Sequence, residues 1–511
     1  MRRFCRALFS RYAVSAIMII LEVALMSYLF ISASDSVYIV IALSLLVSVF
    51  AFFNILIKDT NPEYKISWVA IILLMPPLGA MLYFIFYQRR MSKREIRLIS
   101  GVVSELNSRA VRGDVCPMLK EESPRAAGKA EAILSDDDVA DVYRGTESKY
   151  FPSGEEYFES LISELEGARR YIFLEYFIIE PGVLWDKIHS VLVKKAGEGV
   201  DVRLLYDDVG CMSTLPYRYE YLLRKEGIRA YRFAKVSPRV SSVHHNRDHR
   251  KIAVIDGRVA YTGGVNIADE YANIKKRFGY WKDGGICIRG LAVGGLLKLF
   301  LSSWDFVSKT ISDYDALLSS VEEADNPDGG YYLPFGSGPN PIYRRQVGKN
   351  CFLNIINQAE RYVYITTPYL IIDYDLTESL RNAALRGVDV RIITPGIADK
   401  KAVKIMTKSS YPYLIEAGVK IYEYAPGFIH EKLIVSDGEY AVVGTINFDF
   451  RSLVHHFECA VWMHKTDTVD LIKDGFCQTL ADSVRVSSDK SRLTFTEWVL
   501  RNAVRLFFPL L

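Results

Sequence analysis

Three long apolar stretches dominate the first 90 residues of this chain. They cover residues 14–32, 37–57 and 66–87, and each is long enough to cross a lipid bilayer as a helix. No short apolar core with a small-residue cleavage site precedes polar sequence, so a cleaved signal peptide is not indicated. The pattern predicts a multi-pass membrane region with two to three hydrophobic segments.

The charges that flank these stretches favour two ends on the same side of the membrane. Arginines at positions 2, 3, 6 and 11 and five basic residues between positions 89 and 97 both mark cytoplasmic segments. Three complete crossings would place the two ends on opposite sides of the membrane, so they cannot satisfy both charge signals. In one arrangement the third stretch, which Pro76 and Pro77 interrupt, is bent or re-entrant. In the other, the first stretch, which contains Glu22, lies partly at the membrane interface. Both arrangements predict a cell-membrane protein whose remaining chain is cytoplasmic.

After residue 150 the pattern changes to helices that alternate with buried strands. A helix is predicted from residue 153 to about 169, a strand at 171–177, a helix at 183–198 and a strand at 200–206. Gly, Pro and Asn are concentrated at 326–330 and 336–341, which marks a linker, and the pattern then repeats from Arg345. This alternation predicts an α/β sandwich in two halves.

The predicted organisation has five parts. They are a membrane region (1–90), a polar connector with short helices (91–149), a first half (150–325), a second half (326–485) and a C-terminal tail (486–511). The tail has a broad apolar face interrupted by Arg501 and Arg505. It fits an amphipathic helix on the bilayer surface or a helix packed on the core.

Four blocks of sequence occur twice, in the same order. Residues 171–178 match 362–369, and residues 198–205 match 386–393. The third block is His249-x-Lys251-x4-Asp256 and again His430-x-Lys432-x4-Asp437. The fourth ends in Asn266 in the first copy and in Asn447 in the second. Four ordered matches indicate an internal duplication.

The third block carries the candidate chemistry. Residues two apart on a strand point to the same side, so each copy presents a histidine, as nucleophile or acid, beside a lysine charge. Such a unit suits the handling of phosphate. Asp256 and Asp437 each precede a glycine, and we expect them to shape the turn that closes the strand.

Composition narrows the function further. The chain has 511 residues, 50% of them hydrophobic, and a net charge of +3, which is too small to indicate nucleic-acid binding. The basic run after Tyr87 fits anionic lipid headgroups and also fits a topology signal. Seven scattered cysteines without a CxxC pair indicate neither a zinc site nor a disulfide framework, as in a reducing compartment.

The chain resembles the phospholipase D superfamily, whose signature is His-x-Lys-x4-Asp followed by a small-residue turn and an asparagine. Within it the bacterial cardiolipin synthases are the most similar. Residues 246–256 look like the first motif of that subfamily, and residues 428–432 with 447–452 look like its second. The resemblance runs from about Val37 to the C-terminus. One departure is His455-His456, where the family usually has Leu-Asn, and it alters the polarity beside the second motif.

The resemblance implies two duplicated halves around one shared active site, in which both histidines approach one phosphorus. We expect His249 to be the nucleophile and His430 to be the acid and then the base, although the symmetry of the motifs does not assign the roles. Asn266 and Asn447 would donate to phosphoryl oxygens, and Asp283 and Glu458 would orient the imidazoles. The candidate catalytic set is His249, Lys251, Asp256, His430, Lys432 and Asp437.

The implied reaction joins two phosphatidylglycerol molecules into cardiolipin and glycerol, without a metal or cofactor. The expected partners are phosphatidylglycerol and anionic membrane lipids, with no nucleic acid; the sequence predicts no oligomeric state. One alternative is a hydrolase of phospholipids. A nuclease would also be a hydrolase of this superfamily, but the weak net charge and the membrane segments count against it. Another alternative is an inactive membrane scaffold, which the two intact motifs disfavour.

Overall fold

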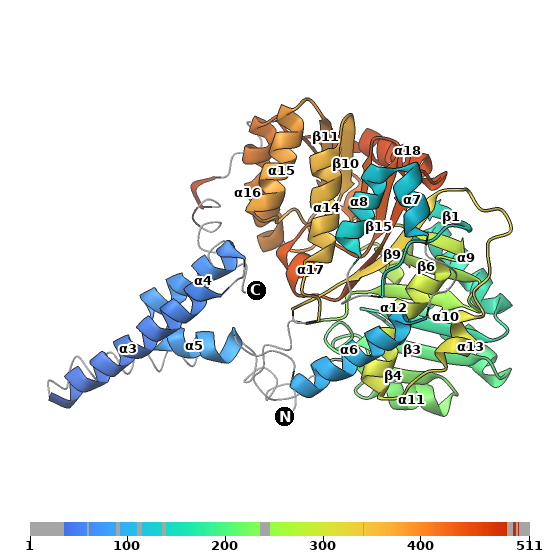
Figure 1. Ribbon diagram of the computed structural model, residues 1–511, viewed down its shortest axis with the longest axis horizontal. Helices are drawn as coiled ribbons and strands as arrows, with labels where there is room; N and C mark the ends of the chain where they lie inside the picture. The colour runs from blue at the N-terminus through green and yellow to red at the C-terminus, as the bar shows by residue number, and fades with distance from the viewer. Residues whose placement is uncertain are drawn as a thin grey trace. The chain divides into compact units, whose positions relative to one another are not determined.

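The computed structural model describes residues 35–58, 61–87, 92–109, 115–134, 139–235, 246–340, 342–487, 494–496 and 499. The chain divides into two compact units (Figure 1). One consists of Met1–Met91, Val236–His245 and Trp498–Leu511, and the other of Ser92–Lys235 and Asn246–Glu497. The apolar stretch 14–32, the arginines at positions 2–11, 89 and 90, and nearly all of the predicted tail from 488 onward lie outside the described residues.

The N-terminal unit contains α3 (Asp35–Ile57), α4 (Pro62–Leu74) and α5 (Leu78–Phe86). Pro76 and Pro77 fall between α4 and α5, where the sequence predicted a break. Packing of Trp68 against Tyr83, with ring centroids 5.7 Å apart, joins these two helices. Among the described residues, no helix is long and apolar enough to span a bilayer. The predicted transmembrane segments are therefore not confirmed.

In the larger unit, three helices precede the first strand of the first half's sheet. The helices are α6 (Lys93–Asn107), α7 (Cys116–Glu122) and α8 (Pro124–Ile133), and the strand is β1 (Thr146–Phe151). Ser92 and Glu95 form a reciprocal capping box at the start of α6, because each side chain accepts from the backbone N–H of the other residue. The stretch predicted as a connector with short helices is thus largely helical.

The first half contains a seven-stranded sheet. Its order is β1, β8 (Gly285–Gly290), β6 (Val259–Gly263), β5 (Lys251–Ile255), β2 (Tyr171–Tyr176), β3 (Asp201–Asp207) and β4 (Arg229–Phe233). β2, β3 and β4 run parallel, whereas β5 pairs with β2 in the antiparallel sense. The helical segments of this half are α9 (Gly154–Gly167), α10 (Val183–Gly197), α11 (Tyr219–Lys225), a 3-10 turn at Asp269–Ala272, α12 (Val293–Ser308) and α13 (Tyr314–Leu318).

The second half contains an eight-stranded sheet. Its order is β17 (Ser483–Arg485), β12 (Lys420–Tyr424), β11 (Asp389–Pro395), β10 (Tyr362–Thr366), β14 (Leu433–Ser436), β15 (Tyr440–Gly444), β16 (Glu458–His464) and β9 (Tyr331–Ser337). Its helices are α14 (Val347–Gln358), α15 (Tyr374–Leu385), α16 (Lys401–Glu416), α17 (Phe450–Val454) and α18 (Thr468–Ala481).

The two sheets repeat one strand order. Strands β1, β8, β6, β5, β2, β3 and β4 correspond in sequence to β9, β16, β15, β14, β10, β11 and β12. The match confirms the predicted mixed α/β fold in two sheet-containing halves, and Figure 1 shows the halves as neighbouring layered blocks.

Strand β2 shows how the sequence fills both faces of a sheet. Ile172, Leu174 and Tyr176 point to one face and join the core cluster that includes side chains of α9 and α10. Phe173 points to the other face, where its ring stacks on Phe300 of α12 at 5.0 Å. Apart from Glu175, which is also buried, the strand is apolar on both faces, as a strand covered on both faces requires.

The backbones of the two halves are joined at two related places. The short strands β7 (Tyr280–Lys282) and β13 (Gly427–Ile429) pair in parallel, and the His430 N–H donates to the Lys282 carbonyl at 2.7 Å. At the other place Asp248 forms a parallel bridge with Phe457, and the His249 N–H donates to the Phe457 carbonyl at 2.8 Å. Each motif histidine is thus positioned by the opposite half.

Candidate active site

The two motif histidines occupy equivalent places at the junction of the halves. His249 lies two residues before the start of β5, and His430 lies three residues before the start of β14. Both are buried, with 8% and 6% of their surface exposed. Because each backbone N–H is bound by the opposite half, the position of each imidazole depends on the assembly of both halves.

Each imidazole is paired with a carboxylate from the other half. Nδ1 of His249 lies 2.9 Å from Oε2 of Glu458, and Nδ1 of His430 lies 2.6 Å from Oδ2 of Asp283. An ionised carboxylate only accepts, so Nδ1 carries the proton and donates it. In a neutral ring Nε2 is then left with a free lone pair, the tautomer that a nucleophilic or basic histidine requires.

The motif lysines are also buried beside the histidines. Nζ of Lys251 donates to the His249 carbonyl at 2.7 Å. Nζ of Lys432 donates to the His430 carbonyl and lies 2.8 Å from Nδ1 of the same residue. Burial lowers the pKa of Lys251 to about 8 and that of Lys432 to about 7, although Glu458 and Asp283 oppose the shifts.

The same burial determines the protonation of the imidazoles. It lowers the pKa of His249 to about 3 and that of His430 to about 4, although the paired carboxylates oppose the shift. For the carboxylates, burial favours the neutral form, but the histidine partners outweigh it and hold the pKa of Glu458 and of Asp283 below the ordinary value. At neutral pH the site therefore contains two carboxylates, two neutral imidazoles and two partly charged lysines.

The two asparagines lie in matched networks. Asn266 accepts from the Ile178 N–H at 3.0 Å and donates to the Tyr271 hydroxyl at 2.8 Å. Asn447 donates to the Ser452 hydroxyl at 3.1 Å, five residues downstream like Tyr271. One amide hydrogen of each is thus committed within the protein, and the second remains for another acceptor.

Asp256 and Asp437 do not reach the histidines. The Asp256 carboxylate accepts from the backbone N–H groups of Arg169, Arg170 and Tyr171 at 2.8, 2.7 and 2.9 Å. Asp256 follows His249 by seven positions, which an extended chain spans in roughly 23 Å. The structure therefore places this member of the candidate catalytic set at the opposite end of β5.

Asp437 repeats the arrangement in the second half. It accepts from the backbone N–H groups of residues 360–362 at 2.9, 2.8 and 2.9 Å. Both aspartates have positive φ, 56° and 58°, in the turn before a glycine. Aspartate tolerates this conformation and satisfies the local donors, so the two residues tie each hairpin to the start of the neighbouring strand.

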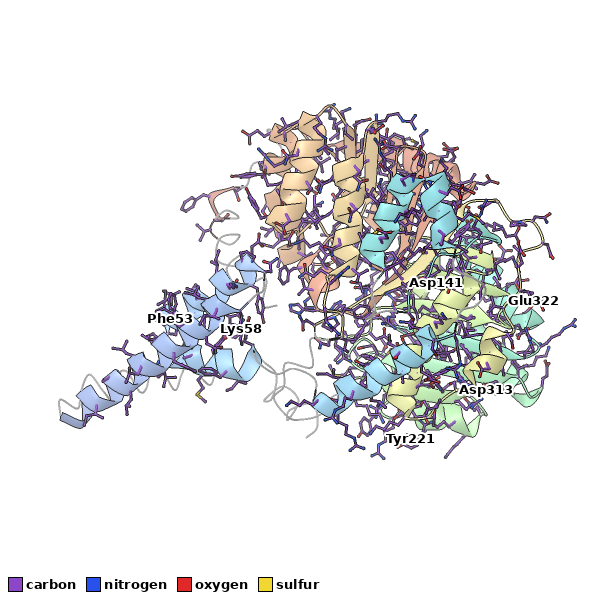
Figure 2. The ribbon with its side chains drawn as sticks, in the orientation of Figure 1. Phe53, Lys58, Asp141, Tyr221, Asp313 and Glu322 are labelled. Carbon is purple, nitrogen blue, oxygen red and sulfur yellow. The ribbon has the colours of Figure 1, made fainter. Side chains whose placement is uncertain are left out.

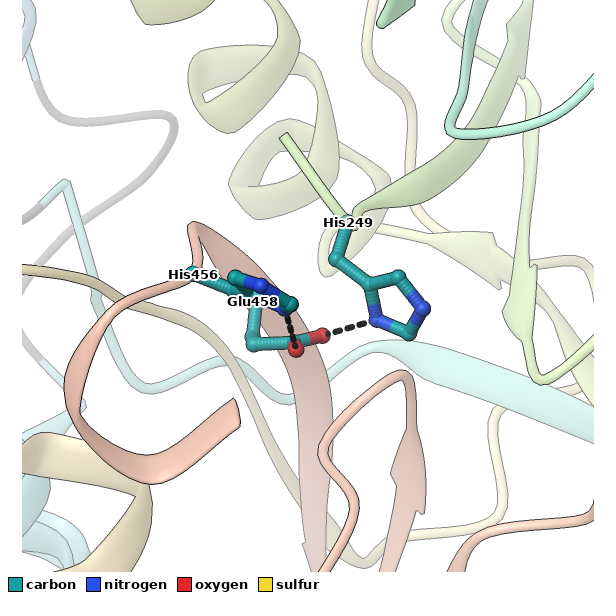
Figure 3. A group of neighbouring side chains, drawn as sticks. All are labelled: His249, His456 and Glu458. Atoms are coloured by element: carbon teal, nitrogen blue, oxygen red, sulfur yellow. Dashed lines mark hydrogen bonds and ion pairs between the residues drawn. The ribbon is translucent and has the colours of Figure 1, made fainter. Parts of the chain in front are cut away.

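Three further residues border the histidines without having been singled out from the motifs. The ring of Tyr271 lies 5.4 Å from that of His430. Thr445 donates its hydroxyl to Glu458. The ring of His456 lies 5.6 Å from that of His249, and its Nδ1 is 3.7 Å from Oε1 of Glu458 (Figure 3). The sequence signal for Tyr271 is its position five residues after Asn266, the same offset at which Ser452 follows Asn447. The signal for His456 is the departure from the family pattern at His455-His456.

The chain matches known families over both halves. The family described as "Cardiolipin synthase, PLD-like domain" matches residues 161–275 and 352–480, and "Phospholipase_D-nuclease N-terminal" matches residues 46–86. A cardiolipin synthase of Geobacillus sp. is 33% identical over 486 residues, which cover 92% of this chain and 94% of that protein. An uncharacterized protein of Streptococcus mutans is 41% identical over 449 residues, 87% of this chain and 96% of that one.

A solved structure supports the fold. The phosphatidylserine synthase of Haemophilus influenzae Rd KW20 has a TM-score of 0.53 with this chain at 13% sequence identity, and covers 71% of this chain and 92% of its own. This likeness concerns the fold, and the identities above concern the family. The chain belongs to the cardiolipin synthase family of the phospholipase D superfamily, and thus to the phospholipid phosphatidyltransferases.

Proposed function

We propose that this enzyme is a cardiolipin synthase, which transfers a phosphatidyl group from one phosphatidylglycerol to another and releases glycerol. The observation that carries the proposal is the crossed pairing of His249 with Glu458 and of His430 with Asp283. It leaves Nε2 free on both rings of one composite site, and a two-step displacement at phosphorus needs one nucleophile and one acid–base group.

In the first step, Nε2 of His249 attacks the phosphorus of the donor lipid. The bond from phosphorus to the glycerol oxygen breaks, and protonated His430 donates its Nε2 proton to that oxygen. The negative phosphodiester favours protonation of His430, because a nearby anion raises the pKa of an imidazole. The products are a phosphatidyl-histidine and free glycerol.

In the second step, the terminal hydroxyl of another phosphatidylglycerol attacks the phosphatidyl-histidine. His430, now neutral, accepts the hydroxyl proton on Nε2, and the bond from phosphorus to His249 breaks. Cardiolipin leaves, and both histidines return to their starting states. Atoms and protons balance over the cycle, so no metal or cofactor is required.

Lys251 and Lys432 serve the phosphoryl oxygens in this proposal. Their ammonium groups are buried with the histidines, where a charge is screened less than in water. The second amide hydrogens of Asn266 and Asn447 are the remaining donors expected to face these oxygens.

The exposed apolar surface of the N-terminal helices fits attachment to a membrane. Large apolar side chains of α3 are exposed, among them Leu46 (64%), Phe50 (63%) and Phe53 (56%). Figure 2 labels Phe53. Exposed apolar surface of this kind is typical of contact with lipid or protein. We propose that residues 1–90 hold the enzyme in the cell membrane as a multi-pass region, with the catalytic halves in the cytoplasm.

Product analysis tests the reaction. Purified enzyme receives phosphatidylglycerol as its sole lipid, and lipid mass spectrometry and a glycerol assay follow the products. Cardiolipin and glycerol in equal amounts are expected. Phosphatidic acid and glycerol without cardiolipin would instead identify a hydrolase, in which water is the acceptor. The His249→Ala, His430→Ala double variant controls for contaminating activity.

A further inference from the structure

His456 completes a cluster of metal-ligand type around the nucleophile pair. His249, His456 and Glu458 each offer one ligand atom, and these atoms all lie within 4.8 Å of one another. Figure 3 shows Nδ1 of His249 facing one oxygen of Glu458 and His456 facing the other. We propose that these three side chains bind one divalent metal ion of the Zn²⁺ class, and that binding inhibits the enzyme.

The spacing of the ligand atoms fits such an ion. Tetrahedral zinc holds nitrogen and carboxylate oxygen at about 2.0–2.2 Å, which places neighbouring ligand atoms about 3.4 Å apart. The contacts from Glu458 to His249 and to His456 are 2.9 and 3.7 Å. These two contacts involve different oxygens of Glu458, and the ligand atoms all lie within 4.8 Å of one another, so shifts of up to about 1.4 Å would bring them to coordinating distance. Two imidazoles, one carboxylate and an open fourth position form a ligand set that zinc accepts.

Two buried atoms point to a missing partner. Oε1 of Glu458 and Nδ1 of His456 face each other at 3.7 Å, and neither atom has a hydrogen-bond partner within the described part of the chain. Glu458 is fully buried, so this oxygen is shielded from bulk solvent. A cation between the two atoms would satisfy both.

The inhibition follows from the tautomer of His249 and therefore rests on the proposed function. A metal on Nδ1 takes the place of the proton that this nitrogen donates to Glu458. Because the ring stays neutral, its single proton then sits on Nε2. The proton reaches Nε2 through solvent, and no proton is released overall. Because protonated Nε2 has no lone pair for phosphorus, the nucleophile is blocked while the metal stays bound.

The duplication supplies an internal comparison. Asp283 corresponds to Glu458, so Trp281 corresponds to His456, two residues earlier in each half. The Trp281 ring lies 5.5 Å from that of His430 and offers no metal ligand. The proposal therefore predicts one metal site per chain, at His249 alone.

Cobalt titration tests the site without relying on catalysis. Co²⁺ substitutes for Zn²⁺ and gives visible absorption when four-coordinate, so each full-length variant is titrated in detergent. The unaltered enzyme should bind one Co²⁺ per chain. His456→Asn should weaken binding at least about ten-fold, the scale on which even a residue beyond the ligand shell acts. His455→Asn is the matched control, because this neighbouring histidine packs on Phe450 instead, and it should bind like the unaltered enzyme.

Three results would overturn the metal site: no one-to-one binding, unchanged affinity in His456→Asn, or an equal loss in His455→Asn. Inhibition is measured separately, as the rate with Zn²⁺ relative to the same variant's rate in EDTA. His456→Asn should need at least about ten-fold more Zn²⁺ for half-inhibition. If cobalt binds as expected but zinc does not inhibit, the result would support the metal site and contradict the proposed block of the nucleophile by the metal.

Discussion

Glu458 of the second half lies 2.9 Å from Nδ1 of His249 in the first half, and Asp283 and His430 repeat the relationship in the opposite direction. Each motif histidine is thus paired with a carboxylate of the opposite half. The duplicated halves therefore form a single composite site whose geometry depends on their junction.

The crossed pairs predict a loss of rate in Glu458→Gln and in Asp283→Asn. An amide keeps the shape, but it removes the charge and can present an N–H to Nδ1, which favours the wrong tautomer. We expect kcat to fall by about 10²–10⁴ with little change in KM. Steady-state kinetics checks this, with the exposed Glu439→Gln as the control. Normal kcat in either crossed variant would contradict the orienting role.

The turn aspartates predict a loss of stability instead. Asp256→Ala leaves three backbone donors without their acceptor and places alanine at a φ of 56°. We expect the free energy of unfolding to fall by about 2–4 kcal/mol, measured by denaturant titration, while the folded molecules keep their kcat. Asp437→Ala should cost less, because Asp437 is only half-buried. A folded Asp256→Ala enzyme without activity would return this residue to the catalytic set.

The lysines predict an alkaline limit to activity. Both must be protonated to stabilise the phosphoryl oxygens, and they lose their charge as the pH rises through their pKa values of about 7 and 8. The value of kcat/KM should thus be high below pH 7 and fall between pH 7 and 8. In Lys432→Arg only the limit from Lys251, near pH 8, should remain. A wild-type profile that is flat to about pH 10 would contradict the assignment.

We expect the enzyme to keep its turnover when metals are removed. In the proposed mechanism, two lysines and two asparagines supply the charge stabilisation that metals supply in other phosphoryl-transfer enzymes. Activity in EDTA should equal or exceed activity without it, since trace zinc at His249 is removed. Loss of turnover in EDTA, restored by added Mg²⁺ or Zn²⁺, would show that the enzyme needs a metal.

The sequence predicted the features that depend on local pattern. Alternating apolar runs predicted two α/β halves, and glycines after Asp256 and Asp437 predicted turns, because strand faces and turn conformations are local properties. The family resemblance implied Asp283 and Glu458 as the orienting carboxylates, each with the histidine it follows in the chain, but the structure pairs each with the histidine of the opposite half. That crossing depends on how the halves pack, which no spacing within one half determines.

Residues brought together by tertiary packing were harder to predict. His456 stood out only as a departure from the family pattern, and the spacing of cysteines and histidines indicated no metal site. The cluster forms only because His456 and the start of β16 lie beside His249, which is 207 residues before His456 in the chain. Tyr271, likewise, acquires its place from the fold of the turn after Asn266.

The central claim is that His249 carries the phosphatidyl group while His430 serves as acid and base. The most direct measurement uses a phosphatidyl donor whose leaving group is p-nitrophenol, which departs without a proton. His430→Ala should release about one p-nitrophenol per chain in a rapid burst and then stall, because the second step lacks its base. His249→Ala should give no burst. A burst in His249→Ala and not in His430→Ala, or a burst in neither, would contradict the account.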